Sequence, residues 1–496
     1  MFAHLRTLLV CLVLVAAVGV ALWRSGVARA LQGGASSGRP VQLKVWDWWS
    51  ASANEEYGAY FDALEKVYEE RYPEVDLVYQ VVPFGNYVQK LATAMVGSAP
   101  PDVFQSSVYW AEGLYQRGML LPLDSLLARD SDLPGGQRLT EEVFLPSAWR
   151  HNHTAEGRVF GIPQIIDAQC LIWNLDLLEK AAQEDEEIRA LFVQLPDGNP
   201  DYLRLRFDAV RDWEHFRRLA KKLTRYGPDG SVTQAGFVIN AYSGGAGMFP
   251  PWLAANGGRF QDEQGTRALF ATPGGVEAME FMARLYWEDR VCPPFRRQIA
   301  DAELFEEGVV ACMAAGTWSG KDIIRDTLGW KHFAKTAFPP GPRGSGQKTL
   351  TWGNMLVISR RCSQVEAAWN YVRLVCGLEG NLLRLKYLGY NGPRLDLYQA
   401  PEWQEAAQAR PYLANVPQIC QAGDKLRHTE IIATDHQATP VFETLLLRYP
   451  EIAAGQGPYP SVAVALAEAA NNVDQVYARY QQQAQGWLAR RGEGVQ

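Results

Sequence analysis

Short apolar runs alternate with amphipathic segments along the first third of the chain. The runs "VQLKVWDWW", residues 41–49, and "VDLVYQVV", residues 75–82, have the length and residue types of buried strands. Between them, apolar residues recur at helical spacing over 57–68, after a capping-box pattern at 52–55. This alternation predicts an α/β protein with a largely parallel sheet.

The same alternation continues further along the chain. The remaining predicted elements are a helix over 87–96, a strand at 103–104, helices over 109–116 and 213–223, a strand "AGFVIN" ending at Asn240, a helix after the N-cap Thr272, and strand-like runs "TAFPPG" and "LTWGNMLVIS". From residue 365 onward the pattern is mainly helical. In parallel sheets ligands bind beyond the carboxyl ends of the strands, which is where Gln105 and Ser106 fall.

Length and charge narrow the class of protein. A chain of 496 residues is too long for one core, so we expect two domains or lobes. The net charge of −7 argues against a nucleic-acid partner, because phosphate binding needs a basic face. The chain has 16 Trp and 21 Tyr, which either fill a large aromatic core or in part line a ligand site.

The N-terminus predicts export. An apolar run from Leu8 to Trp23 follows Arg6, and Ala28-Arg29-Ala30 fits a signal-peptidase site, so we expect residues 1–30 to be a signal peptide. The alternative is an uncleaved anchor. The protein would then be periplasmic, or tethered to the outer face of the cytoplasmic membrane. Residues 31–40 have the composition of a flexible linker.

Motifs for metals and cofactors are weak. Apart from Cys11 in the apolar run, six scattered cysteines show no metal spacing, and we expect most to be buried thiols, with disulfides left open. "HNH", residues 151–153, reads as a surface loop. "GPRGSGQKT" departs from a P-loop in spacing and context. We therefore expect no cofactor and no metal.

Several segments, taken in order, resemble one family. "GSAPPDVF" followed by "AEGLYQRGMLLPLD", then "GRVFGIPQIIDAQCLIWNLDLLEKA", "FEEGVVACMAAGTWSGKDI" and "TWGNMLVIS", resemble the extracellular solute-binding proteins of ABC importers, the group that includes maltose-binding protein. The resemblance extends over about residues 41–477. Tryptophan stands at position 173, where the family has tyrosine.

The resemblance implies the periplasmic-binding-protein fold, in which two α/β lobes are joined by three hinge crossings. The crossings would lie near 160–165, 336–340 and 355–359. The N-lobe would comprise 41–162 plus 337–357, and the C-lobe 165–335 plus 358–486. A carbohydrate would bind between the lobes of a monomer, and closure would create the form that docks on the membrane permease.

Candidate ligand-binding residues follow from strand ends and from the resemblance. Asp47 and Trp49 are placed for the cleft, whereas Trp46 and Trp48 favour the core, because side chains alternate along a strand. The resemblance implies that Trp318 stacks on a sugar and that Asp167 reaches the ligand. The further candidates are Gln105, Ser106, Tyr109, Tyr242, Trp252, Trp352, Asn354 and, more weakly, Arg394. Each aromatic could instead be a core residue, each acid a solvated charge, and any of Gln105, Ser106 and Tyr109 a helix cap.

Two other functions remain open. A secreted glycoside hydrolase or lyase would also use tryptophans and paired carboxyl groups, but the sequence singles out no such pair. A binding protein for a polyol, glycerol phosphate or peptide is the second alternative, and a phosphate ligand would require arginine or a helix N-terminus in the cleft. The carbohydrate-binding hypothesis predicts that Trp318→Ala weakens binding at least about tenfold.

Overall fold

The computed structural model describes residues 41–48, 55–97, 99–154, 156–239, 249–262, 266–293, 304–305, 307–317, 332–425 and 431–492. The strands are β1 (Val41–Asp47), β2 (Val75–Val81), β3 (Val103–Ser107), β4 (Ile162–Asn174), β5 (Phe192–Gln194), β6 (Pro200–Leu205), β7 (Arg225–Tyr226), β8 (Val232–Gln234), β9 (Cys312–Gly316), β10 (Phe333–Thr336), β11 (Thr349–Ile358) and β12 (Gly423–Lys425). Eight of them form one curled mixed sheet, in which the path β10-β4-β11-β3-β1-β2 is joined by β12 beside β11 and by β9 beside β4.

The parallel part of the sheet is the part that the sequence predicts best. β1 runs parallel to β2, with Val41 opposite Val75, and parallel to β3, with Trp46 opposite Phe104. The alternation of strand and helix explains this, because a helical connection returns the chain to the same sheet edge. The rest of the sheet contains antiparallel pairs. β4 pairs antiparallel with β11, β9 and β10, and β11 also pairs antiparallel with β3.

The helices cover this sheet. They are α3 (Glu55–Arg71), α4 (Phe84–Val96), α5 (Val108–Gln116), α6 (Asp124–Arg129), α7 (Pro146–Trp149), α8 (Leu175–Ala182), α9 (Glu186–Arg189), α10 (Trp213–Leu223), α11 (Phe249–Ala255), α12 (Pro273–Trp287), α15 (Val365–Cys376), α16 (Leu378–Leu388), α17 (Pro401–Ala409), α18 (Val416–Gln421), α19 (Ile431–Leu447), α20 (Tyr449–Ala453) and α21 (Val462–Gly492). The predicted cap of α12 is confirmed, since the Thr272 side chain accepts a hydrogen bond from the Gly275 N–H. Over 235–239, the described part of "AGFVIN", the chain makes isolated bridges at Ala235 and Val238 rather than a named strand.

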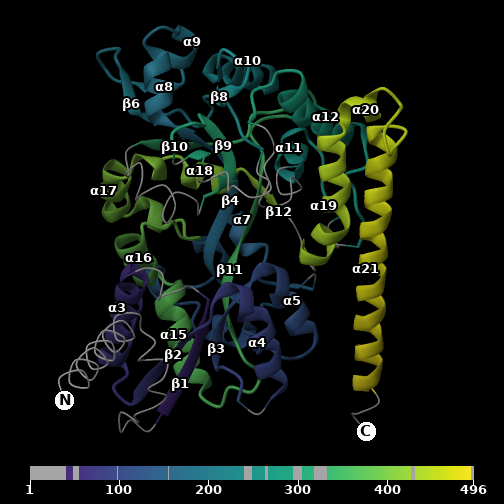
Figure 1. Ribbon diagram of the computed structural model, residues 1–496. Coiled ribbons are helices and arrows are strands. Elements are labelled where there is room, and N and C mark those ends of the chain that lie inside the picture. The colour runs from purple at the N-terminus through teal and green to yellow at the C-terminus, as the bar shows by residue number, and fades with distance from the viewer. Residues whose placement is uncertain are drawn as a thin grey trace, which may run out of the picture.

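Two long strands connect the two halves of the molecule. β4 pairs first with β11 and then with β9 and β10. β11 begins beside β12 and ends beside β3, on the sheet of the N-terminal half. Figure 1 shows both strands running through the centre, from the purple and blue elements into the teal elements. This joint is where a two-lobe protein would bend.

The hydrophobic clusters show which segments pack together. Leu43 and Val45 of β1 share a cluster with Trp369 and Val372 of α15. Phe338 instead belongs to the large cluster of the C-terminal half. The lobe boundaries stay a prediction, but the packing favours assigning α15 to the N-terminal half and residues 337–350 to the C-terminal half.

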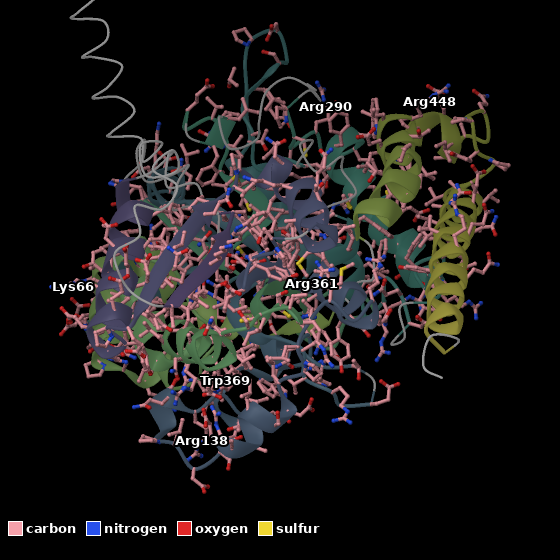
Figure 2. All side chains as sticks on the ribbon, turned by 90° about the horizontal axis from the view of Figure 1, so that it is seen from below. Lys66, Arg138, Arg290, Arg361, Trp369 and Arg448 are labelled. Carbon is pink, nitrogen blue, oxygen red and sulfur yellow. The ribbon has the colours of Figure 1, made fainter. Side chains whose placement is uncertain are left out.

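Charged side chains spread over the surface. Among the labelled residues in Figure 2, Lys66, Arg138, Arg290 and Arg448 lie at separate places on the periphery. Arg138 pairs with Glu142 at 3.3 Å. Within the described ranges, none of the helices is both long enough and apolar enough to cross a bilayer.

Candidate functional site

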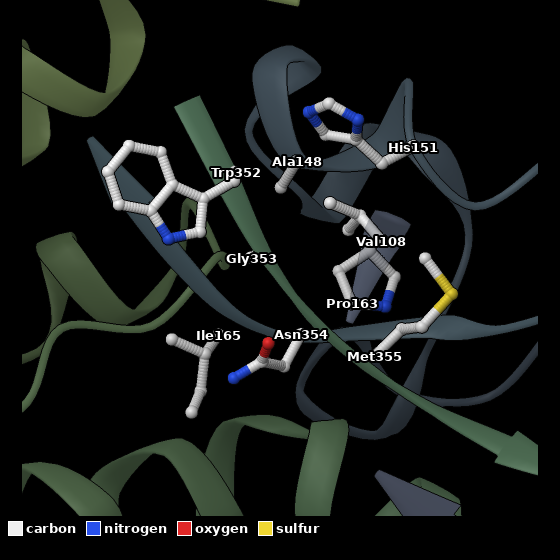
Figure 3. Close-up of a pocket in the computed structure, with 9 residues that line it drawn as sticks. All are labelled: Val108, Ala148, His151, Pro163, Ile165, Trp352, Gly353, Asn354 and Met355. Atoms are coloured by element: carbon white, nitrogen blue, oxygen red, sulfur yellow. The ribbon is translucent and has the colours of Figure 1, made fainter. Parts of the chain in front are cut away.

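A pocket lies at the joint between the two halves. Its lining comes from β11, the start of β4, the first residue of α5, and the α7 region (Figure 3): Val108, Ala148, His151, Pro163, Ile165, Trp352, Gly353, Asn354 and Met355. The cavity volume in this structure is only about 10 Å³, the space of about one water molecule, so a larger ligand would enter only if the two halves moved apart. An indole, an amide and an imidazole beside apolar side chains make a surface suited to a ligand with apolar faces and hydroxyl groups.

The backbone of β11 approaches β4 closely beside this pocket. A Cβ on Gly353 would lie 2.1 Å from the Ile165 carbonyl oxygen, so only glycine fits without moving the strands. The register also shifts between Asn354 and Met355, where Ile165 and Pro163 are the successive partners. This irregularity bends the ladder and aims side chains at the pocket.

Asp167 is buried in β4, opposite Trp352 of β11. The Thr317 hydroxyl donates to Asp167 Oδ1 at 3.1 Å. Burial raises the pKa of the Asp167 carboxyl to about 7, although the Thr317 hydrogen bond and the Lys335 charge both act to lower it. In this structure Asp167 is therefore a buried group behind the joint rather than a solvated surface acid.

The carboxyl ends of β1 and β3 carry the other predicted polar candidates. Asp47, Gln105 and Ser106 are all buried. Neither amide atom of Gln105 has a hydrogen-bond partner in the described part of the chain. A buried amide without partners costs free energy, so Gln105 is a suitable group to hydrogen-bond a ligand. The prediction that Trp46 and Trp48 are core residues is confirmed, since both are buried in one cluster.

Two further candidates, Trp252 and Arg394, lie inside the protein. Trp252 is 0% exposed within the core of the C-terminal half, with its ring centroid 4.9 Å from those of Phe281 and Phe338. Arg394 is also fully buried: it pairs with Asp396 at 2.7 Å, and its guanidinium donates to the carbonyls of Arg138 and Gly135. Core packing around Trp252 and the internal hydrogen bonds of Arg394 favour structural roles for these two side chains.

The structure describes some of the remaining candidate residues completely, one in its backbone only, and others not at all. Trp49, Tyr242 and Trp318 lie outside the described residues. The backbone of Tyr109 lies in α5, but its side chain is outside the description. Trp352 and Asn354 line the pocket, so the structure brings together these two candidates with Asp167 behind them.

The sequence interpretation missed His151. We expected "HNH" to be a surface loop, but His151 and Asn152 are buried and His151 lines the pocket. α7, just before it, packs against β4 and β11 and brings the loop to the joint. Local composition carries no signal for this contact, because it depends on long-range packing. The six described cysteines are all buried, as expected for thiols in a core.

The fold and the pocket at the joint define a two-lobe binding protein, and comparisons with known proteins identify its family. Residues 51–377 match the model of the bacterial extracellular solute-binding proteins, and the chain belongs to that family. A binding protein of Brucella abortus (strain 2308) is 23% identical over 355 residues, covering 70% of this chain and 75% of the relative. An uncharacterized ABC transporter extracellular-binding protein of Pyrococcus horikoshii is 30% identical over 195 residues, which are 38% of this chain and 41% of that protein.

Solved structures support the same fold. The sugar-binding protein MalE of Xanthomonas citri superposes with a TM-score of 0.67 at 19% identity, covering 89% of this chain and 98% of that one. The cyclic α-maltosyl-1,6-maltose-binding protein of Arthrobacter globiformis gives 0.65 at 18% identity, covering 88% and 99%. At these identities the likeness shows the two-lobe fold of periplasmic binding proteins, not the ligand.

Proposed function

We propose that this protein captures a carbohydrate between its two lobes and delivers it to the membrane permease of an ABC importer. The observation that carries the proposal is the pocket at the joint, where Trp352 and Asn354 stand beside Gly353. The C–H face of a sugar packs on an indole, and its hydroxyls exchange hydrogen bonds with an amide. Membership of the solute-binding family and the sugar-binding structural neighbours support it.

The mechanism is capture by closure about β4 and β11. Ligand that contacts both lobes favours the closed state by its differential affinity for that state. Trp49 and Trp318 are proposed to complete the aromatic walls of the cleft, and Asp47 and Gln105 to hydrogen-bond the hydroxyls of the bound sugar. An affinity near 1 μM would correspond to about −8 kcal/mol.

A neutral ligand fits the described pocket better than an anion. No arginine or lysine is among the pocket-lining residues described. Arg384 is buried beside β4, but its guanidinium donates to the Gln164 carbonyl and to the Tyr60 hydroxyl. We therefore rank a sugar or polyol above glycerol phosphate.

A thermal-shift screen of neutral oligosaccharides and their phosphorylated counterparts tests the proposal, followed by calorimetry on hits. A ligand that binds only the native state raises the melting temperature. Uptake of the labelled sugar by cells lacking this chain tests delivery. Reducing ends that accumulate with purified protein would favour the hydrolase alternative, and shifts confined to phosphorylated compounds would contradict the neutral-ligand proposal.

A further inference from the structure

A buried group of three side chains includes Asp167, which is paired across the β4–β11 ladder with the pocket-lining Trp352. We name Asp167 of β4, Thr317 after β9, and Lys335 of β10 the relay. The Thr317 hydroxyl donates to Asp167 Oδ1 at 3.1 Å, and Lys335 Nζ donates to the Thr317 carbonyl oxygen at 2.6 Å. The exposed fractions of Asp167 and Lys335 are only 4% and 1%. An acid and an amine are thus both removed from water yet linked through one threonine.

Thr317 also closes the ladder between β9 and β4. Its N–H donates to the Ala168 carbonyl at 2.8 Å, and its hydroxyl oxygen accepts from the Ala168 N–H at 3.0 Å. Asp167, the neighbour of Ala168, stands opposite Trp352 in β11. The relay therefore fastens the segment of β4 that supports the pocket-lining part of β11.

The groups around the relay come from β4 itself and from three other elements. Cys170 on β4, Cys420 on α18 and Tyr398 on the short helix Leu397–Gln399 all lie within electrostatic range of Asp167. Lys335 also stands 4.6 Å from the ring centroid of Tyr412. Burial raises the pKa of the Cys170 thiol to about 12 and that of Cys420 and Tyr398 as well, so these groups stay neutral near pH 7.

We propose that the relay is a proton-responsive latch, in which protonation of Asp167 tightens the β4–β9 ladder and thereby strengthens ligand capture in mildly acidic surroundings. A neutral carboxyl still accepts the Thr317 hydrogen bond, so acidification removes a buried negative charge without breaking the contact. The second half of the proposal depends on the proposed function, because it requires a ligand in the adjacent pocket.

The direction in which pH changes the stability of the latch follows from the difference in Asp167 pKa between its closed and opened states. The closed latch holds the Asp167 proton more tightly than an opened, hydrated latch does, since burial raises its pKa to about 7. Stability of the latch is therefore gained as the pH falls through 7 and lost as it rises again. Lys335, whose pKa burial lowers to about 8, keeps its proton over the acidic side of this range and does not reverse the effect.

Hydrogen–deuterium exchange on the ligand-free full chain tests the latch. Peptides covering 166–173 and 310–317 are followed at pH 5.5 and 7.5, after correction for intrinsic exchange. We expect protection of the Thr317 and Ala168 amides to rise about tenfold at the lower pH. Asp167→Asn, which mimics the neutral carboxyl, should lose this pH dependence, whereas the matched variant of an exposed acid, Asp208→Asn, should keep it.

Two further outcomes decide the matter. Equal protection at both pH values in the unsubstituted protein, or unchanged pH dependence in Asp167→Asn, would overturn the latch. Should Asp167→Asn not fold, infrared spectra of the unsubstituted protein should show a carboxylic C=O band of a buried acid growing between pH 7.5 and 5.5, and its absence would overturn the proposal.

The ligand half is tested separately with maltose as the probe. Affinity is measured by calorimetry at both pH values, and we expect it to be about threefold or more tighter at pH 5.5, with the difference lost in Asp167→Asn. Equal maltose affinity at pH 5.5 and 7.5 would overturn the proposed coupling between Asp167 protonation and ligand binding. Failure of the whole oligosaccharide panel to bind would contradict the proposed function but leave the exchange result on the latch intact.

Discussion

Trp352 of β11 lies opposite Asp167 of β4, so a pocket-lining indole and a buried carboxyl share one rung of the joint between the two halves. The indole is half-buried, which leaves part of its face for a ligand. Gly353, next along β11, allows the two strands to come close enough for this rung to sit at the pocket. The geometry ties ligand contact to the strands that pass between the lobes.

The first prediction concerns Trp352. Trp352→Ala should weaken binding of the sugar found in the screen by about 5- to 30-fold, since loss of one stacking surface removes about 1–2 kcal/mol. Calorimetry measures the affinity, and the melting temperature reports the fold. The matched control is Trp287→Ala on α12, 40% exposed, whose indole N–H donates to the Leu446 carbonyl. Equal loss of affinity in both variants would remove Trp352 from the site.

A second prediction separates core tryptophans from ligand-facing ones. Trp252→Ala should lower the free energy of unfolding by about 3–5 kcal/mol, because it leaves a cavity among Phe281 and Phe338. Urea unfolding measures this loss. The fraction that stays folded should bind the ligand with unchanged affinity. A variant of normal stability with weakened binding would return Trp252 to the cleft.

The sequence could predict the elements but not the contacts made across the chain. β1 and β2 were predicted because their β-branched and apolar residues mark buried strands. The crossing expected at 336–340 was placed by the family resemblance, and it stays a prediction. In the structure Phe338 packs on Trp252 in the C-terminal core, and β11 pairs with β3 of the N-terminal half, contacts that depend on residues far apart in the chain.

In the candidate site, too, the sequence indicated some residues from local motifs but could not predict those that depend on long-range packing. Trp352 and Asn354 were found because the strand "TWGNM" resembles a family crossing, and both line the pocket. Trp252 could have been a cleft or a core residue on the sequence alone, and in the structure α11 carries its indole into the core. His151 was missed because only the packing of α7 against β4 brings it there.

A third prediction concerns Arg394, which the structure makes a structural residue. Arg394→Met should lower the free energy of unfolding by about 2–4 kcal/mol, since it leaves the carbonyls of Gly135 and Arg138 and the Asp396 carboxylate without their donor. Lys66→Met, at an exposed lysine, should change stability by less than about 0.5 kcal/mol. Ligand affinity of folded Arg394→Met should match that of the unsubstituted protein, and a selective loss of affinity would contradict this assignment.

The last prediction concerns pH and a histidine far from the pocket. His215, buried on α10, accepts a hydrogen bond at Nδ1 from the Arg211 N–H at 3.1 Å. Burial lowers the pKa of His215, and the nearby Arg211 charge adds to the effect. The folded state therefore favours the neutral ring, and this contribution to stability is present above pH about 6.5 and lost as the pH falls through the lowered pKa.

His215→Gln removes that titration. The difference in free energy of unfolding between the unsubstituted protein and His215→Gln, measured by urea unfolding, should shrink as the pH is lowered from 7.5 to 5. Taking the difference cancels the contribution of Asp167, which has the opposite sign over this range. His332→Gln serves as the control, because His332 is a half-exposed histidine paired with Asp176 on the surface. A difference that stays constant with pH would show that the His215 ring does not titrate between its folded and unfolded states.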